Sequence, residues 1–174
     1  MFRFQVLLYQ TLMLLLKLGA KLLPEAKPMV LAGQGSSQRL TETIGHLGLK
    51  KVLLVTDTLL VELGLVEPVI EGLRKQGITT VIYDGIQPDP TFDVVNAGLE
   101  RLRAEQCDSV LAFGGGSAMD AAKLMALAAN NQRSPESLVG LFKARQPALP
   151  LFVIPTTAGT GSEATIASVI SDSA

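Results

Sequence analysis

The feature that most constrains the fold of this 174-residue chain is an apolar run followed at once by three glycines. Residues 109–113 read Ser-Val-Leu-Ala-Phe, and residues 114–120 read Gly-Gly-Gly-Ser-Ala-Met-Asp. Glycine lacks a Cβ, so its backbone can adopt positive φ and its amide groups can approach an anion closely. Ser117 and Asp120 have the spacing of a helix N-terminus, where exposed amides and the helix dipole favour phosphate. The segment therefore predicts a strand, a turn and a helix, and the turn is either a phosphate site or only a capped connection.

Similar apolar runs alternate with helical patterns along the chain. The expected strands are residues 51–56, 78–83, 109–113 and 151–154, with a further short strand at 29–31. The expected helices are residues 67–76, 91–102 and 117–128, with another helix beginning at Ser134 and Pro135. Continuous apolar strands that alternate with amphipathic helices are typical of parallel sheets covered on both faces. The predicted fold is therefore α/β, with a doubly wound parallel sheet.

Polar or glycine-rich residues follow each of the expected strands. They are Asp57-Thr58, residues 84–89, residues 114–117 and residues 155–161. In open parallel sheets, ligands bind beyond the carboxyl ends of the strands, where these four segments converge. The convergence favours a nucleotide-binding site over a simple connection.

Asp57 has the position from which a carboxylate often accepts hydrogen bonds from ribose hydroxyls. A carboxylate there would repel a 2′-phosphate, so it favours NAD over NADP. The alternative is that Asp57 or Thr58 only caps a helix that begins at Leu59.

Residues 155–164 read Pro-Thr-Thr-Ala-Gly-Thr-Gly-Ser-Glu-Ala. Their hydroxyls and glycines are suited to hydrogen bonds with phosphate or sugar oxygens. Gly159, Gly161 and Ala164 also satisfy the G-x-G-x-x-A dinucleotide pattern. That pattern needs a following helix, a second strand and an acidic residue about twenty positions on, so we interpret the match as coincidence.

Three single residues have simpler interpretations. Lys123 either reaches a phosphate or is a solvated helical residue, and His46 is structural or exposed. Cys107 is expected to be buried, because no basic partner is visible that would activate it. With one histidine and one cysteine, no catalytic residue and no metal ligand is assigned.

Composition excludes several classes of protein. Hydrophobic residues make up 48% of the chain and charged residues 18%, which is typical of a globular protein. A net charge of −1 gives no support to nucleic-acid binding. A single cysteine forms no disulfide within the chain, which favours a reducing, cytoplasmic location.

Within residues 1–27, the run from Val6 to Leu18 is strongly apolar but interrupted by Gln10, Thr11 and Lys17. The apolar run is too short to span a bilayer and lacks a clean signal-peptide cleavage site. We expect an apolar helix that packs on the domain or on a partner chain, which leaves homo-oligomerisation open and makes membrane association the less favoured interpretation.

Two long motifs resemble a known family. Residues 114–123 read Gly-Gly-Gly-Ser-Ala-Met-Asp-Ala-Ala-Lys, and residues 155–163 read Pro-Thr-Thr-Ala-Gly-Thr-Gly-Ser-Glu. Both resemble the iron-containing (group III) alcohol dehydrogenases, and Thr56-Asp57 and residues 88–90 follow in the order that this family shows. The resemblance runs from about residue 28 to the last residue.

The resemblance implies a Rossmann-like N-terminal domain, residues 28–174, that binds NAD(P). A helical domain that holds a divalent metal, commonly iron, follows it in the family. The cleft between the two domains carries hydride transfer between a primary alcohol and its aldehyde. By position, the pyrophosphate would be covered by Gly115, Gly116, Ser117 and Asp120. The adenosine half would be met by Asp57 and Asp89. The phosphate and the nicotinamide-side ribose would face Thr156, Thr157 and Thr160, in a pocket that is also lined by Thr165 and Ala167.

The family's metal ligands, an aspartate and histidines of the helical domain, have no counterpart in this sequence. We therefore expect a truncated chain that binds the cofactor at best weakly and has no turnover alone. The alternative is a non-catalytic nucleotide-binding or self-associating module. Related folds act on glycerol or sugar-derived phosphates, and the Thr-Thr-Ala-Gly-Thr-Gly-Ser-Glu segment favours the alcohol dehydrogenases over them.

Overall fold

The structure is a computed structural model that describes residues 13, 28–140 and 142–172. The apolar helix expected over residues 1–27 lies, apart from Met13, outside the described residues and stays a prediction. The residues from Leu31 onward form one compact unit, and the description below concerns that unit.

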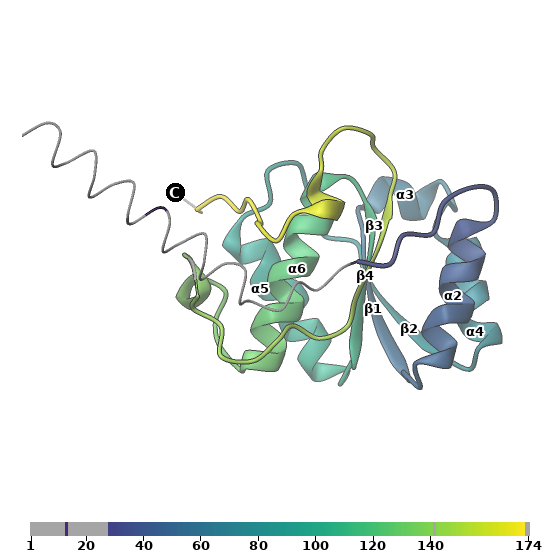
Figure 1. Cartoon of the computed structure of the whole chain (residues 1–174), viewed down its shortest axis with the longest axis horizontal. Coiled ribbons are helices and arrows are strands. Elements are labelled where there is room, and N and C mark those ends of the chain that lie inside the picture. The colour runs from purple at the N-terminus through teal and green to yellow at the C-terminus, as the bar shows by residue number, and fades with distance from the viewer. Residues whose placement is uncertain (1–12, 14–27, 141, 173–174) are drawn as a thin grey trace, which may run out of the picture. The chain divides into compact units, whose positions relative to one another are not determined.

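A four-stranded parallel sheet forms the centre of this unit (Figure 1). Its strands are β1 (Lys51–Val55), β2 (Thr79–Tyr83), β3 (Ser109–Gly114) and β4 (Leu151–Pro155), and their order is β2-β1-β3-β4. All four correspond to expected strands, so the predicted α/β sheet is confirmed. The strand expected at residues 29–31 is wrong, because Met29 and Val30 lie exposed in irregular backbone.

Helices connect the strands in the alternation that a parallel sheet requires. They are α2 (Ser36–His46), α3 (Thr58–Glu62), α4 (Glu67–Lys75), α5 (Phe92–Ala104) and α6 (Gly116–Asn131), with the 3₁₀ turns η1 (Glu136–Leu138) and η2 (Ser162–Ala164). Gly77 lies just beyond α4 with φ 74°, the left-handed conformation that was expected to end this helix. The helix expected to start at Ser134 is only the short turn η1, and Pro135 rather than Ser134 precedes it.

The sheet is covered on both faces (Figure 1). Leu53, Val55 and Val110 pack in one cluster with residues of α5 and α6. Their strand neighbours, such as Leu54 and Leu111, point to the other face and pack with residues of α2 and α4. This alternation follows from the two-residue period of a strand, and it makes the sheet doubly wound, as expected. A parallel sheet of this kind brings all strand carboxyl ends to one edge.

Candidate functional site

Four loops meet at the carboxyl edge of the sheet. The backbone N–H of Thr156, just after β4, donates to the carbonyl of Gly114 at 3.0 Å. Thr58 Oγ1, after β1, donates to the carbonyl of Asp84, after β2, at 3.1 Å. The polar segments that follow the strands in the sequence therefore lie together in space, as expected.

The glycine turn leads directly into α6. The helix begins at Gly116, Gly115 is its N-cap residue with extended backbone, and no side chain caps it. The expected capping box is therefore wrong: Ser117 lies inside the first turn, two residues beyond the N-cap position. The first N–H groups of a helix have no intrahelical partner. No backbone carbonyl elsewhere in the described part of the chain accepts a hydrogen bond from the N–H of Gly116 or Ser117.

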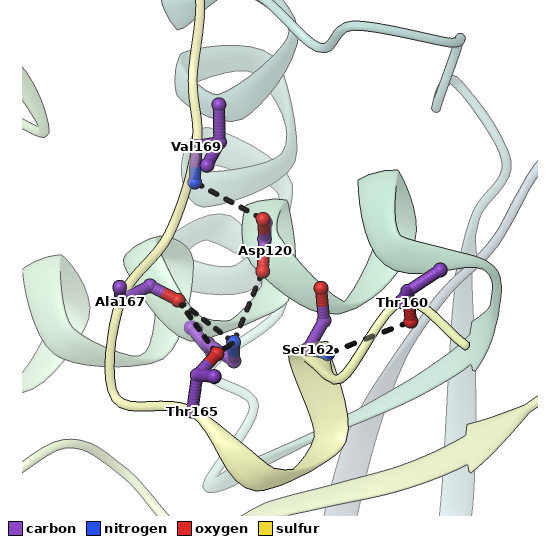
Figure 2. Close-up of polar contacts among 7 residues, drawn as sticks. Asp120, Thr160, Ser162, Thr165, Ala167 and Val169 are labelled. Atoms are coloured by element: carbon purple, nitrogen blue, oxygen red, sulfur yellow. Dashed lines mark hydrogen bonds and ion pairs between the residues drawn. The ribbon is translucent and has the colours of Figure 1, made fainter.

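The loop after β4 places hydroxyl groups against this turn. A Cβ on Gly115 would lie 3.2 Å from Thr157 Oγ1, and a Cβ on Gly116 would lie 3.2 Å from Ser162 Oγ. Thr160 Oγ1 accepts a hydrogen bond from the N–H of Ser162 at 3.5 Å, which closes the loop locally (Figure 2). A side chain at either position would be tight against a hydroxyl group, so glycine is what lets the loop lie this close to the turn.

Asp57 acts as the N-cap of α3. Its Oδ1 accepts a hydrogen bond from the N–H of Leu60 at 3.0 Å, so the capping interpretation is confirmed. Its Oδ2 lies at the glycine turn, 4.0 Å from the position that a Cβ on Gly114 would take. The cap therefore uses one carboxylate oxygen and holds the other beside the turn.

Asp89 lies on the exposed loop after β2. Its φ of 52° is left-handed, a conformation that aspartate tolerates better than most residues. Pro90, which follows it, is buried and fixes the loop to the domain. The position of Asp89 at the carboxyl edge agrees with the place expected for it, and its contact with the adenosine half stays a prediction.

Asp120 and Lys123 form an ion pair on α6. Lys123 Nζ lies 3.0 Å from Asp120 Oδ1, and only 13% and 10% of the two side chains are exposed. Lys123 also donates to Thr165 Oγ1 and to the carbonyl of Ala167, while Asp120 Oδ2 accepts from the N–H of Val169 (Figure 2). The solvated interpretation of Lys123 is therefore wrong. The predicted contact of Asp120 with a pyrophosphate stays a prediction, and both of its oxygens have partners within the chain.

The remaining predicted residues are exposed at the same edge. Thr156, Thr157 and Thr160 lie in the loop after β4, and Thr165 and Ala167 lie in the segment that follows η2. Sequence reasoning missed Ser162, which is buried and faces Gly116. The sequence feature that could have identified Ser162 is its place in the same hydroxyl-rich segment, residues 155–164. The pattern falls on the short 3₁₀ turn η2 (Ser162–Ala164), with Gly161 as its N-cap, rather than on a helix after a strand, so the G-x-G-x-x-A match has no dinucleotide-binding context.

His46 and Cys107, to which the sequence assigned no catalytic or metal-binding role, lie where they were expected. His46 is exposed at the end of α2, and Cys107 is buried, which raises the pKa of its thiol to about 11. Among residues 28–140 and 142–172, no three His, Cys, Asp or Glu side chains are grouped so that they could hold a metal ion. In the same part of the chain, no helix is long and apolar enough to cross a membrane.

The family model of the iron-containing alcohol dehydrogenases matches residues 28–174. The chain belongs to this family. Alcohol dehydrogenase 4 of Schizosaccharomyces pombe is 43% identical to it over 142 residues, which are 82% of this chain and 34% of the relative. The NAD-dependent methanol dehydrogenase of Bacillus methanolicus is 37% identical over 147 residues, which are 84% of this chain and 39% of the relative.

Solved structures of iron-containing alcohol dehydrogenases share the fold. A 1,3-propanediol oxidoreductase matches with a TM-score of 0.71 and 37% identity, over 75% of this chain and 34% of the other. A sulfoacetaldehyde reductase from Bifidobacterium kashiwanohense, solved in complex with NAD⁺, matches with a TM-score of 0.73 and 32% identity, over 83% of this chain and 38% of the other. The matching part of these relatives is the N-terminal, Rossmann-like domain, and the chain spans between about a third and two fifths of their length.

Proposed function

We propose that this chain is the NAD-binding part of an iron-dependent alcohol dehydrogenase, which transfers a hydride between a primary alcohol and NAD. The observation that carries the proposal is the glycine turn at the start of α6: the N–H groups of Gly116 and Ser117 have no backbone acceptor within the described residues, and hydroxyls of the loop after β4 lie against the turn. Two of the relatives support it, since one is named an NAD-dependent methanol dehydrogenase and another was solved with NAD⁺.

The residues at the carboxyl edge fit a dinucleotide. Gly115, Gly116 and Ser117 offer backbone amides and the positive end of the α6 dipole to the pyrophosphate. The hydroxyls of Thr157 and Thr160 lie across the turn and can donate to phosphate or ribose oxygens. NAD, when bound, supplies the hydride acceptor. We assign the adenosine half to Asp57 and Asp89, and the nicotinamide-side pocket to Thr156, Thr165 and Ala167.

The described residues do not fit the metal of the family, because they contain no group of side chains that could hold one. We therefore propose that the chain alone binds cofactor without turnover. An alcohol or aldehyde is the proposed substrate of the complete enzyme. The single cysteine of the chain supports a cytoplasmic location, and homo-oligomerisation is left open.

Titration of the 174-residue chain with NADH tests the cofactor site. We expect saturable enhancement of NADH fluorescence at micromolar to millimolar concentrations, since the amides, dipole and hydroxyls of the turn are all in place. Competition by unlabelled NAD⁺ is the control for non-specific quenching. A linear response without saturation would contradict the proposal.

Replacing Asp57 by asparagine should relax the preference for NADH over NADPH. Asparagine is as good an N-cap as aspartate, so the hydrogen bond to the N–H of Leu60 is retained. This substitution removes the negative charge that repels a 2′-phosphate. We expect the dissociation constant for NADPH, divided by that for NADH, to fall by about fivefold. This corresponds to a repulsion of about 1 kcal/mol at a partly exposed site. Fluorescence titration with both nucleotides measures the ratio. A matched control is Asp93→Asn at an exposed position of α5, which should leave the ratio unchanged.

A non-catalytic nucleotide-binding module is the second candidate, favoured by the lack of a metal-binding group in the described residues. Both functions predict NADH binding. They differ in activity: only the dehydrogenase part should contribute to alcohol-dependent reduction of NAD⁺ when the family's helical domain is supplied as a second chain with ferrous iron.

A further inference from the structure

The segment of residues 165–171, called the strap here, crosses the N-terminal half of α6 (Figure 2). Lys123 Nζ donates to Thr165 Oγ1 at 3.2 Å and to the carbonyl of Ala167 at 2.8 Å. Asp120 Oδ2 accepts from the N–H of Val169 at 3.0 Å. The two side chains on α6 thus bind every second residue of this part of the strap, at positions 165, 167 and 169.

The far end of the strap is joined to the loop after β2. The N–H of Ser171 donates to the carbonyl of Pro90 at 2.9 Å, and the N–H of Phe92 donates to the carbonyl of Ser171 at 3.3 Å. These bonds form a parallel bridge between Thr91 and Ser171. The strap therefore connects α6, which starts at the glycine turn, to the residues that directly follow Asp89.

The charged groups of Asp120 and Lys123 bind each other and the strap, within the protein itself. A lysine ammonium has three donors, and here they meet Asp120 Oδ1, Thr165 Oγ1 and the carbonyl of Ala167. A largely buried ion pair is worth its desolvation only when further hydrogen bonds satisfy both partners. Both partners meet that condition through the strap, and neither side chain is left pointing at the glycine turn.

We propose that Lys123 and Asp120 are positioning residues that hold the strap, and through it the nicotinamide-side wall and the Asp89 loop, in the geometry that receives the dinucleotide. This inference rests on the proposed function, because Thr165 and Ala167 are the wall residues that Lys123 binds. Ordering the wall before the ligand arrives removes an entropic cost from binding. The pair acts on the site through the strap.

Two measurements on the full 174-residue chain test the inference. Hydrogen–deuterium exchange of peptides covering residues 165–172 reports on the strap without any ligand, and NADH titration reports on the site. The variants are Lys123→Met, which keeps the apolar stem, and the double variant Lys123→Met/Asp120→Asn, which leaves no unpaired buried charge and protects against misfolding. The control is Arg74→Met, which removes an ion pair of the same i,i+3 spacing on α4, where the arginine side chain is 74% exposed.

We expect exchange in residues 165–172 to rise about tenfold in both variants while peptides of β1 and β3 keep their protection. The dissociation constant for NADH should rise about five- to tenfold, and Arg74→Met should change neither quantity. Unchanged strap exchange would overturn the inference. Faster exchange with unchanged NADH affinity would overturn the link to the cofactor site. If the unmodified chain binds no NADH, the proposed function fails, and the exchange data still decide whether the pair holds the strap.

Discussion

Valine in place of Gly116 should weaken NADH binding by about 5- to 150-fold. A Cβ at this position would lie 3.2 Å from Ser162 Oγ and 3.5 Å from Thr160 Cβ, and valine adds two methyl groups beyond it. Filling a closely packed space in this way costs about 1–3 kcal/mol, which corresponds to that loss of affinity. Either the loop after β4 moves away from the turn, or the methyl groups occupy the space meant for the pyrophosphate. Fluorescence titration with NADH measures the change.

The fold should survive Gly116→Val, because Gly116 is the first residue of α6 and lies at the edge of the domain. Circular dichroism is expected to be unchanged. Ala104→Val is the matched control: it adds the same two methyl groups at the exposed last residue of α5. An affinity equal to that of the unmodified chain would mean that the pyrophosphate does not bind at this turn.

Truncation of Leu111 to alanine should lower the free energy of unfolding by about 2–5 kcal/mol. Leu111 is fully buried in β3, a strand that has partners on both sides. Its side chain belongs to the cluster that includes Ile44 and Leu73, so the cavity lies between the sheet and the α2 and α4 layer. For a domain of this size, about 3 kcal/mol corresponds to a decrease in Tm of about 6–12 °C. Thermal unfolding followed by circular dichroism measures it.

Leu63→Ala provides the comparison, since Leu63 at the end of α3 is 61% exposed. Its expected effect is below about 0.5 kcal/mol, as for most exposed positions. Equal losses in the two variants would show that Leu111 is not packed as described.

The regular part of the fold was predictable because the physical signals are local. The runs of residues 51–56 and 109–113 are apolar on both faces, which only a covered strand requires, and Gly77 has the one residue type that ends α4 at no steric cost. Helix α2 was not predicted. It follows a glycine-rich turn and fully buries only Thr41 and Ile44, so its apolar stripe is too narrow to stand out in the sequence.

The predictions about the site that were wrong concern residues whose contacts are tertiary. The spacing of Ser117 and Asp120 matches a capping box, but α6 starts at Gly116, so Asp120 falls in the second turn and faces inward. Its partner Val169 lies 49 residues away, and no local pattern reveals such a contact. Lys123 was interpreted as solvated or phosphate-binding for the same reason. The prediction that the loops meet at the carboxyl edge was confirmed, because sheet topology alone brings them together.

The strand order also determines how the domain is assembled during synthesis. β1 pairs with β2 and with β3, and β3 pairs in turn with β4. On the ribosome, β1 and β2 emerge first, and the second edge of β1 stays unpaired until residues 109–114 have left the exit tunnel. An apolar edge of this kind is the surface on which nascent chains associate wrongly. We therefore expect wrong association to be most frequent after β1 and β2 have paired and before β3 has left the exit tunnel.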